Sequence, residues 1–254
     1  RGISINQDTG EAFSGGTSKY IYRLTIDPTD YTKGTSSVIC TRDIESGQMG
    51  CYGLTPVFNQ PGIFYESNRS NGNTNSLVVK YDFRDIQNPS PPSVISSGKT
   101  RTYGIVSDPV GNVFVSYDGG TIKIIAGPDS PKTFSAATRT GLGCCHRGIC
   151  AEFRNTYPNG LNSNHVFLAN SVERKVMRWK MDQFGFVAGS VVAYAINLSG
   201  IFEPCGVGAD SENNQYIVGT DATRTNGNKI LKIYRVENNH TYPSRYSLYV
   251  NPSP

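Results

Sequence analysis

Short runs in which apolar and polar residues alternate make up most of the chain, and Gly, Pro, Asn and Asp separate these runs. In the segment 175–181, Met177 and Trp179 fall on one face, whereas Arg178 and Lys180 fall on the other. A period of two residues is typical of a strand that buries one side. The pattern therefore predicts an all-β protein.

The same strand pattern recurs along the chain, and a glycine begins each copy. Successive copies begin 51, 51, 56 and 46 residues apart. A four-stranded propeller blade needs roughly 40 to 50 residues, so the repeat predicts one blade per copy. Glycine suits the first strand of a blade, because backbones crowd together near the central channel. The five phased glycines are Gly2, Gly53, Gly104, Gly160 and Gly206.

Each copy contains three more expected strands after the one that starts at the glycine. The second strands are expected at 11–13, 63–65, 112–115, 165–168 and 215–218. The third strands are expected at 19–26, 77–83, 121–125, 175–181 and 229–235. The fourth strands are expected near 37–40, 93–96, 132–135, 190–194 and 246–250.

These strands predict a single β-propeller domain over residues 1–254, because each blade covers the faces that its neighbours cannot bury alone. The expected five blades are 1–50, 51–102, 103–157, 158–203 and 204–254. Six blades are the alternative, if processing has removed an N-terminal segment. The first residues lack the charged and apolar regions of a signal peptide, which favours a mature chain whose targeting segment is gone.

Composition narrows the classes of function. The net charge of +4 is spread along the chain without a run of five basic residues, which argues against nucleic-acid binding. No window of eighteen residues is wholly apolar, so we expect no membrane span. Charged residues make up 17% of the chain, below the roughly 25% of average soluble proteins. Such a surface is typical of extracellular β proteins.

An even number of cysteines favours a disulfide framework, although sequence cannot select among fifteen pairings. We prefer a bond between Cys40 and Cys51, local closure within the group at 144–150, and one bond from that group to Cys205. Buried thiols in a cytosolic protein are the alternative. The six cysteines are Cys40, Cys51, Cys144, Cys145, Cys150 and Cys205.

Three glycosylation sequons support secretion. Asn68, Asn197 and Asn239 each begin an Asn-X-Ser/Thr triplet in an expected turn or blade edge, where a glycan is tolerated. Together with the cysteines they predict a secreted, extracellular glycoprotein.

Two segments resemble known propeller families. The segment 103–115 reads YGIVSDPVGNVFV and resembles the inner two strands of an NHL-like blade. The segment 158–161 reads PNGL, and an apolar strand and then RKVMR at 174–178 follow it. This order is similar to the superfamily of senescence-marker-like gluconolactonases and strictosidine-synthase-like proteins. The resemblance implies a propeller fold over most of the chain.

The resemblance also implies a channel metal site, which this sequence preserves only in part. Asn159 matches the family asparagine whose amide oxygen points to a divalent cation. The next blade of the family supplies a carboxylate, but the chain has Cys205 at that position, with Glu203 as a weak substitute. Calcium prefers six or more oxygen ligands, including carboxylates. We therefore expect no cofactor, with calcium at Asn159 and Glu203 as the alternative.

No catalytic set stands out in the sequence. The three histidines are His146, His165 and His240, and no nucleophile elbow accompanies them. A zinc site at 144–150 is disfavoured, because structural zinc normally takes its ligands from two spaced pairs. We therefore lean away from an enzyme and expect no catalytic residue.

The expected function is a non-catalytic binding or extracellular assembly module, whose protein or glycan partner meets the propeller rim. One alternative is a calcium-dependent lactonase or esterase-like hydrolase of the gluconolactonase type. A further alternative is a metal-free, strictosidine-synthase-like enzyme with Glu203 as general base.

Overall fold

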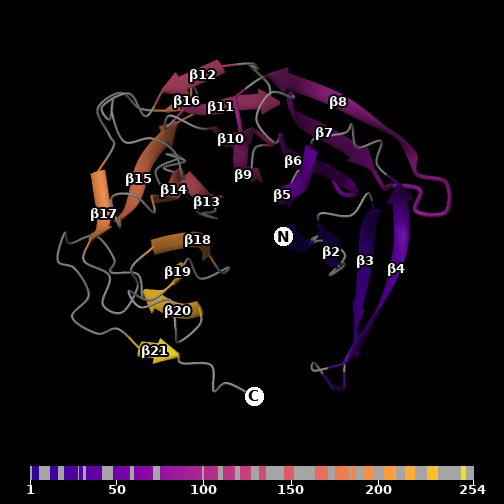
Figure 1. The fold of residues 1–254 in the computed structure, drawn as a ribbon, viewed down its shortest axis with the longest axis horizontal. Coiled ribbons are helices and arrows are strands. Elements are labelled where there is room, and N and C mark those ends of the chain that lie inside the picture. Colours follow the sequence, from indigo (N-terminus) through magenta and orange to yellow (C-terminus); the bar gives the residue numbers. More distant parts are fainter. Residues whose placement is uncertain are drawn as a thin grey trace. The chain divides into compact units, whose positions relative to one another are not determined.

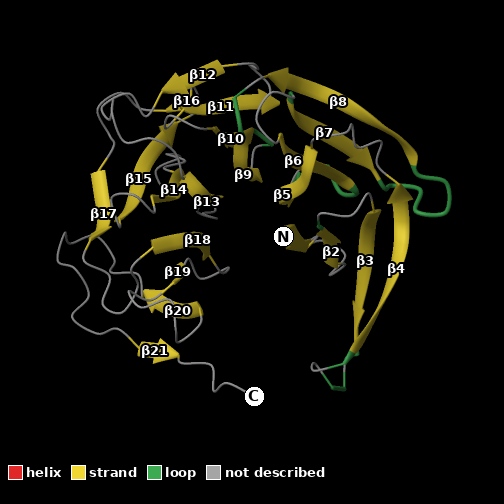
Figure 2. Cartoon of the chain, in the orientation of Figure 1, coloured by secondary structure: helices red, strands yellow, loops and turns green. Residues whose placement is uncertain are grey.

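The computed structural model describes the chain as strands and short connections, with no helix among the described residues (Figure 2). Accordingly, the described part contains no helix of the length and apolar character that a membrane crossing needs. The described residues are 2–5, 12–16, 20–27, 29–30, 33–41, 48–57, 60–70, 75–98, 100–107, 111–117, 121–126, 132–135, 146–151, 164–170, 175–182, 185–186, 192–196, 203–209, 215–220, 228–233 and 247–249.

The strands form five antiparallel sheets, numbered here in chain order (Figure 1). Sheet one contains β1 (Gly2–Ile5), β2 (Ala12–Gly15), β3 (Tyr20–Ile26) and β4 (Gly34–Thr41). Sheet two contains β5 (Gln48–Pro56), β6 (Ile63–Ser70), β7 (Ser76–Asp82) and β8 (Ser90–Gly98). Sheet three contains β9 (Thr102–Ser107), β10 (Val113–Tyr117), β11 (Thr121–Ala126) and β12 (Lys132–Ser135).

The last two sheets follow the same order of strands. Sheet four contains β13 (His146–Ala151), β14 (Asn164–Asn170), β15 (Lys175–Asp182), β16 (Gly185–Phe186) and β17 (Val192–Ile196). Sheet five contains β18 (Glu203–Ala209), β19 (Gln215–Thr220), β20 (Asn228–Ile233) and β21 (Ser247–Tyr249). In sheet four, β16 and β17 both pair with β15, so two short segments share the place of a fourth strand.

The expected second, third and fourth strands are confirmed in all five sheets, because alternation of apolar and polar residues marks them clearly. The first strand of sheet four is different. The sequence predicts it at 158–161, but β13 pairs with β14. Gly148 of β13, rather than Gly160, therefore takes the position of the phased glycine. The segment 158–161 lies outside the described residues.

The reason for this difference lies in the composition of β13. In the sequence, residues 144–150 resemble a cysteine group rather than a strand, because three cysteines and a histidine interrupt a short apolar run there. The run nevertheless behaves as a buried strand, since Ile149, Cys150 and Ala151 are at most 7% exposed. A buried cysteine acts as a small hydrophobic residue, so Cys150 fits in the middle of β13.

The chain divides into two compact units, Arg1–Ser135 and Ala136–Pro254. In the first unit, sheets one, two and three pack in series, with β1 against β5 and β5 against β9. In the second unit, β13 of sheet four packs against β18 of sheet five. First strands that lie beside one another while the sheets pack face to face are characteristic of propeller blades.

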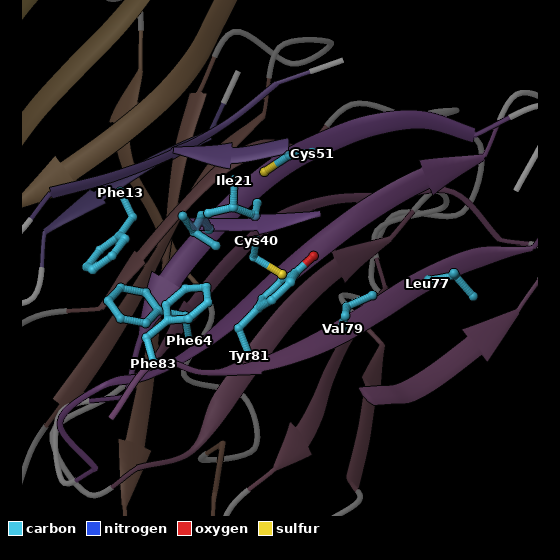
Figure 3. Close-up of a cluster of buried hydrophobic side chains, with 10 residues drawn as sticks. Phe13, Ile21, Cys40, Cys51, Phe64, Leu77, Val79, Tyr81 and Phe83 are labelled. Atoms are coloured by element: carbon cyan, nitrogen blue, oxygen red, sulfur yellow. The ribbon is translucent and has the colours of Figure 1, made fainter. Parts of the chain in front are cut away.

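Aromatic rings fill the space between sheets one and two (Figure 3). The ring centroids of Phe13 and Phe64 lie 4.4 Å apart, and Phe83 stacks on Phe13 at 5.5 Å. Tyr81 stacks on Phe83 at 5.5 Å. Each fully buried large side chain stabilises the folded state by about 1.5–3 kcal/mol relative to an exposed one.

A second cluster lies between sheets two and three. Its members come from facing strands of the two sheets and are at most 9% exposed: Val57, Ile63, Tyr65, Val78, Ile105, Val113, Val115, Tyr117 and Ile125. Burial raises the pKa of the Tyr65 hydroxyl. Burial also raises the pKa of Tyr117, although a hydrogen bond with Ser96 opposes the rise. The two phenols therefore resist ionisation in the folded protein.

The phased glycines allow the first strands to approach closely. A Cβ atom placed on Gly53 would lie 2.9 Å from Ile105 Cγ2 and 3.0 Å from its backbone nitrogen. A Cβ atom on Gly148 would lie 2.5 Å from the Cα atom of Gly206. Such distances are too short or very tight for real side chains, so the predicted crowding is confirmed for Gly53. Gly148, which the sequence did not single out, is crowded in the same way.

Candidate functional site

A bulge near the start of several first strands changes the direction of one side chain. In sheet two, Cys51 pairs with Asn68 and Gly53 pairs with Ser67, so Tyr52 is an extra residue in β5. Bulges redirect side chains and are frequent beside functional sites. Tyr52 therefore leaves the regular alternation of its strand.

The same irregularity recurs at the equivalent place in sheets three, four and five. Tyr103 and Gly104 together lie opposite Ser116 in sheet three. Arg147 is the extra residue before Gly148 in sheet four, and Cys205 is the extra residue before Gly206 in sheet five. The residue in front of the phased glycine is thus a repeated structural position. In the first unit, two tyrosines occupy it.

Arg69, near the end of β6, lies against the rings of Tyr52 and Tyr103. Its Cζ atom is 5.0 Å from the ring centroid of Tyr52 and 4.8 Å from that of Tyr103. Arg69 Nη1 donates a hydrogen bond to the Tyr52 hydroxyl at 3.2 Å. The two rings meet edge to face at 6.1 Å. A guanidinium group within about 6 Å of an aromatic centroid is attracted by the ring face.

The charge of Arg69 has no carboxylate counterpart among the described residues, whose ion pairs lie elsewhere. Its Nε atom is buried and has no hydrogen-bond partner in the described part of the structure. The hydroxyl oxygen of Thr102 is also buried without a hydrogen-bond partner in the described part of the structure. A buried polar atom without a partner costs about 1–3 kcal/mol, so an acceptor that reached Arg69 Nε would stabilise the protein.

Buried serines hold the backbone behind this site. Ser67 Oγ donates to the carbonyl oxygen of Tyr103 at 2.6 Å and thereby joins β6 to β9. Ser116 Oγ accepts from the Gly104 amide at 2.9 Å and donates to the Gly104 carbonyl at 3.2 Å. These bonds satisfy backbone groups that the bulge removes from the ladder. The position of Tyr103 is therefore fixed. We call Tyr52, Arg69 and Tyr103 the Arg69 cluster.

The predicted metal ligands are not brought together in the described structure. Asn159 lies outside the described residues, and Glu203 begins β18, where only its backbone is described. No group of three or more histidine, cysteine, aspartate or glutamate side chains that could hold a metal occurs within the described ranges. The calcium site is therefore still a prediction.

Three of the six cysteines have described side chains, and all three are buried. Cys40 Sγ donates to the Thr41 carbonyl at 3.5 Å, and Cys51 Sγ donates to the Gly53 carbonyl at 3.4 Å. Both thiols border the aromatic cluster between sheets one and two (Figure 3). The structure contains no disulfide among the described residues. Cys144 and Cys145 lie outside the described residues, and only the backbone of Cys205 is described.

The sequence predicted Asn68 at a turn or blade edge, but the structure places it inside a strand. It lies within β6, and its side chain is only 2% exposed. Attachment of a glycan needs an exposed amide nitrogen, so this position is unsuitable for one in the folded chain. Asn197 and Asn239 lie outside the described residues.

The Arg69 cluster was missed at the level of sequence. A signal for half of it was present, because Tyr-Gly occurs both at 52–53 and at 103–104, in phase with the repeat. Arg69 carried no such signal, since it stands inside a sequon that suggested a surface turn. Only the pairing of β5 with β6, and the packing of β9 on both, bring the three side chains together.

With this geometry established, comparison with known proteins defines the class as β-propeller. A quinoprotein alcohol dehydrogenase-like protein from Bacteroides thetaiotaomicron superposes with a TM-score of 0.50 at 15% identity, over 91% of this chain and 52% of that chain. A luciferin-regenerating enzyme superposes with a TM-score of 0.57 at 15% identity, over 92% of this chain and 71% of that chain.

An Aleuria aurantia lectin in complex with Fucα1-6GlcNAc superposes with a TM-score of 0.56 at 10% identity, over 94% of this chain and 73% of that chain. At such identities the likeness shows the fold alone. The chain spans about half the length of the first of these structures. The sequence matches no family model and no curated protein. The protein therefore has an all-β propeller fold.

Proposed function

We propose that the chain is a non-catalytic binding or extracellular assembly module. The observation that carries this proposal is the Arg69 cluster, in which a partly buried arginine lies against two tyrosines without a carboxylate counterpart among the described residues. Tyrosine and arginine are enriched among the residues that contribute most to binding. A strand framework that holds a few polar groups in place is suited to ligand recognition.

The partner that we propose is a protein or a glycan. The fucose complex of the Aleuria aurantia lectin supports a glycan, because it shows that a propeller of comparable fold can carry sugar recognition. Tyr52 and Arg69 are partly exposed, so a partner can reach the edge of the cluster. Secretion, the cysteine bonds and glycans at Asn197 and Asn239 belong to the same proposal, which the even cysteine count and the two sequons support.

We also propose that, among propellers, the chain is related to the NHL-like and gluconolactonase groups. It is supported by the segment 103–115, because β9 and β10 form the two strands that the motif implies. We do not extend this proposal to the hydrolytic activity of the gluconolactonases, because that alternative depends on Asn159 and Glu203.

A binding assay on wild-type protein and the Arg69→Ala variant tests the proposal. The two proteins are applied to glycan arrays and to immobilised extracellular-matrix proteins, and both are assayed against lactones and aryl esters. We expect saturable binding of the wild type, loss of that binding in the variant, and no turnover. Turnover with burst or steady-state kinetics, or equal binding by both proteins, would contradict the proposed role of this surface.

A further inference from the structure

The donors of Arg69 that remain available define which chemical group can join the cluster. Nη1 is engaged by the Tyr52 hydroxyl, whereas Nε is buried without an acceptor among the described residues. Nε and Nη2 together form the side edge of a guanidinium group. A carboxylate accepts two parallel hydrogen bonds from such an edge, which adds both strength and geometric specificity.

The local charge also favours an anion. The nearest acidic residue along the strand is Glu66, three positions before Arg69. An odd spacing places the two side chains on opposite faces of β6. Glu66 accepts a hydrogen bond from the Tyr81 hydroxyl on its own face, among the aromatic residues between sheets one and two. Its carboxyl group is therefore committed to the other side of the sheet and does not neutralise Arg69.

The magnitude of the charge favours a monoanion. Arg69 contributes one positive charge, and the faces of Tyr52 and Tyr103 carry the negative side of the ring quadrupole. A dianion such as phosphate would bring a second negative charge toward these rings. A carboxylate matches the single cation.

We propose that the Arg69 cluster binds the carboxylate group of a small acidic ligand. This inference rests on the proposed binding function and specifies the chemistry of its ligand. Nε is closed to solvent in this conformation, so the carboxylate enters as the ring of Tyr52 turns aside. Tyr52 is the partly exposed ring of the pair, whereas Tyr103 is buried at 2% exposure and fixed by Ser67.

The direct test follows the side-chain Nε–H resonances of arginine in ¹⁵N-labelled full-length protein during titration. Sodium acetate and sodium glucuronate are the anionic probes, and acetamide and glucose are their neutral counterparts at equal ionic strength. We expect the Arg69 resonance to shift saturably with both anions and to stay in place with both neutral probes. Tighter binding of glucuronate than of acetate would identify an acidic sugar as the source, and equal binding would identify the carboxylate alone.

Variants separate this site from general charge effects. Arg69→Gln removes the cation and should weaken acetate and glucuronate binding by about 10- to 100-fold, as expected for a hydrogen bond to a charged group. Arg69→Lys keeps the charge but loses the side edge, so we expect an intermediate loss. Arg84→Gln is the matched control, because Arg84 pairs with Asp82 at the opposite end of sheet two.

Several results would overturn the inference. One is the absence of a saturable shift at 100 mM probe, and another is an equal response to phosphate and acetate or to acetamide and acetate. Equally weakened anion binding in Arg69→Gln and Arg84→Gln would also overturn the inference. If Arg69→Gln does not fold, the comparison of acetate with acetamide on the wild type decides the question. Binding of a neutral glycan or a protein without any carboxylate response would refute this inference but leave the proposed function intact.

Discussion

At the scale of single residues, this protein depends on a few positions where two strands come closer than side chains allow. Gly53 contacts Ile105 of the next sheet, and Gly148 contacts the backbone of Gly206. The neighbours of Gly148 are backbone atoms, which cannot move aside as the end of a flexible side chain can. The glycines therefore stabilise the packing because they have no Cβ atom to separate the strands.

Gly148→Ala should destabilise the protein by about 1–3 kcal/mol, because its Cβ atom would lie 2.5 Å from the Gly206 Cα atom. Gly208→Ala is the control, since a Cβ atom at Gly208 has no atom within 4 Å. Thermal unfolding should show a lower midpoint for the first variant and almost no change for the second. Equal midpoints for the two variants would show that β13 and β18 do not pack as described.

Glu66 and Tyr81 form a second pair that matters at this scale. Both side chains are fully buried, and the Tyr81 hydroxyl donates to the Glu66 carboxylate. Tyr81→Phe removes this donor from a buried acceptor, and we expect a loss of about 1–3 kcal/mol. Chemical denaturation measures the loss, with Tyr22→Phe as a partly exposed control. A Tyr81→Phe protein as stable as the wild type would mean that Glu66 does not depend on this bond.

At the scale of elements, the first strands of sheets two to five combine a bulge with a glycine at the phased position. In β5 and β9 the bulge directs Tyr52 and Tyr103 toward Arg69, and hydrogen bonds from Ser67 and Ser116 hold the loosened backbone. The glycine allows neighbouring sheets to approach closely, whereas the bulge changes the direction of the side chain that precedes the glycine.

The packing of sheet two on sheet three predicts a loss of stability in alkali. Burial raises the folded-state pKa of Tyr65 and of Tyr117 above the ordinary value of 10.0. The folded state therefore keeps protons that the unfolded chain loses. Stability is complete below about pH 10 and falls as the pH rises from there through the folded-state pKa values.

Melting curves between pH 8 and pH 11.5 measure this effect. The double variant Tyr65→Phe and Tyr117→Phe has no phenol to ionise at these positions. Its midpoint should fall less steeply above pH 10 than that of the wild type. Parallel curves for the two proteins would assign the alkaline loss to other groups.

At the scale of the whole molecule, repetition of one four-stranded sheet gives the propeller fold, and the irregularities between repeats give the chain its individual chemistry. Sheet four closes with two short segments, β16 and β17, in place of one fourth strand. Tyrosine precedes the phased glycine in sheets two and three, whereas arginine and cysteine precede it in sheets four and five. Function therefore has to be sought in these differences.

Calcium distinguishes the binding module from the hydrolase alternative for the whole protein. A ligand present at about a hundred times its dissociation constant adds roughly 2.7 kcal/mol to the free energy of unfolding. We expect equal thermal midpoints in excess EGTA and in millimolar calcium. A clearly higher midpoint in calcium would support a metal site at Asn159 and Glu203, and lactones and esters would then be the substrates to assay.

The sequence by itself determined the fold class and nearly all strands, because alternation with a period of two and turns at regular spacing are local properties of the chain. It did not determine where a short, cysteine-rich run becomes a strand, since β13 depends on pairing with β14. It also did not reveal the Arg69 cluster. Arg69 and Tyr103 are far apart in sequence, and only the packing of sheet two on sheet three brings their side chains together. Contacts of this kind depend on register and twist, which local patterns do not encode.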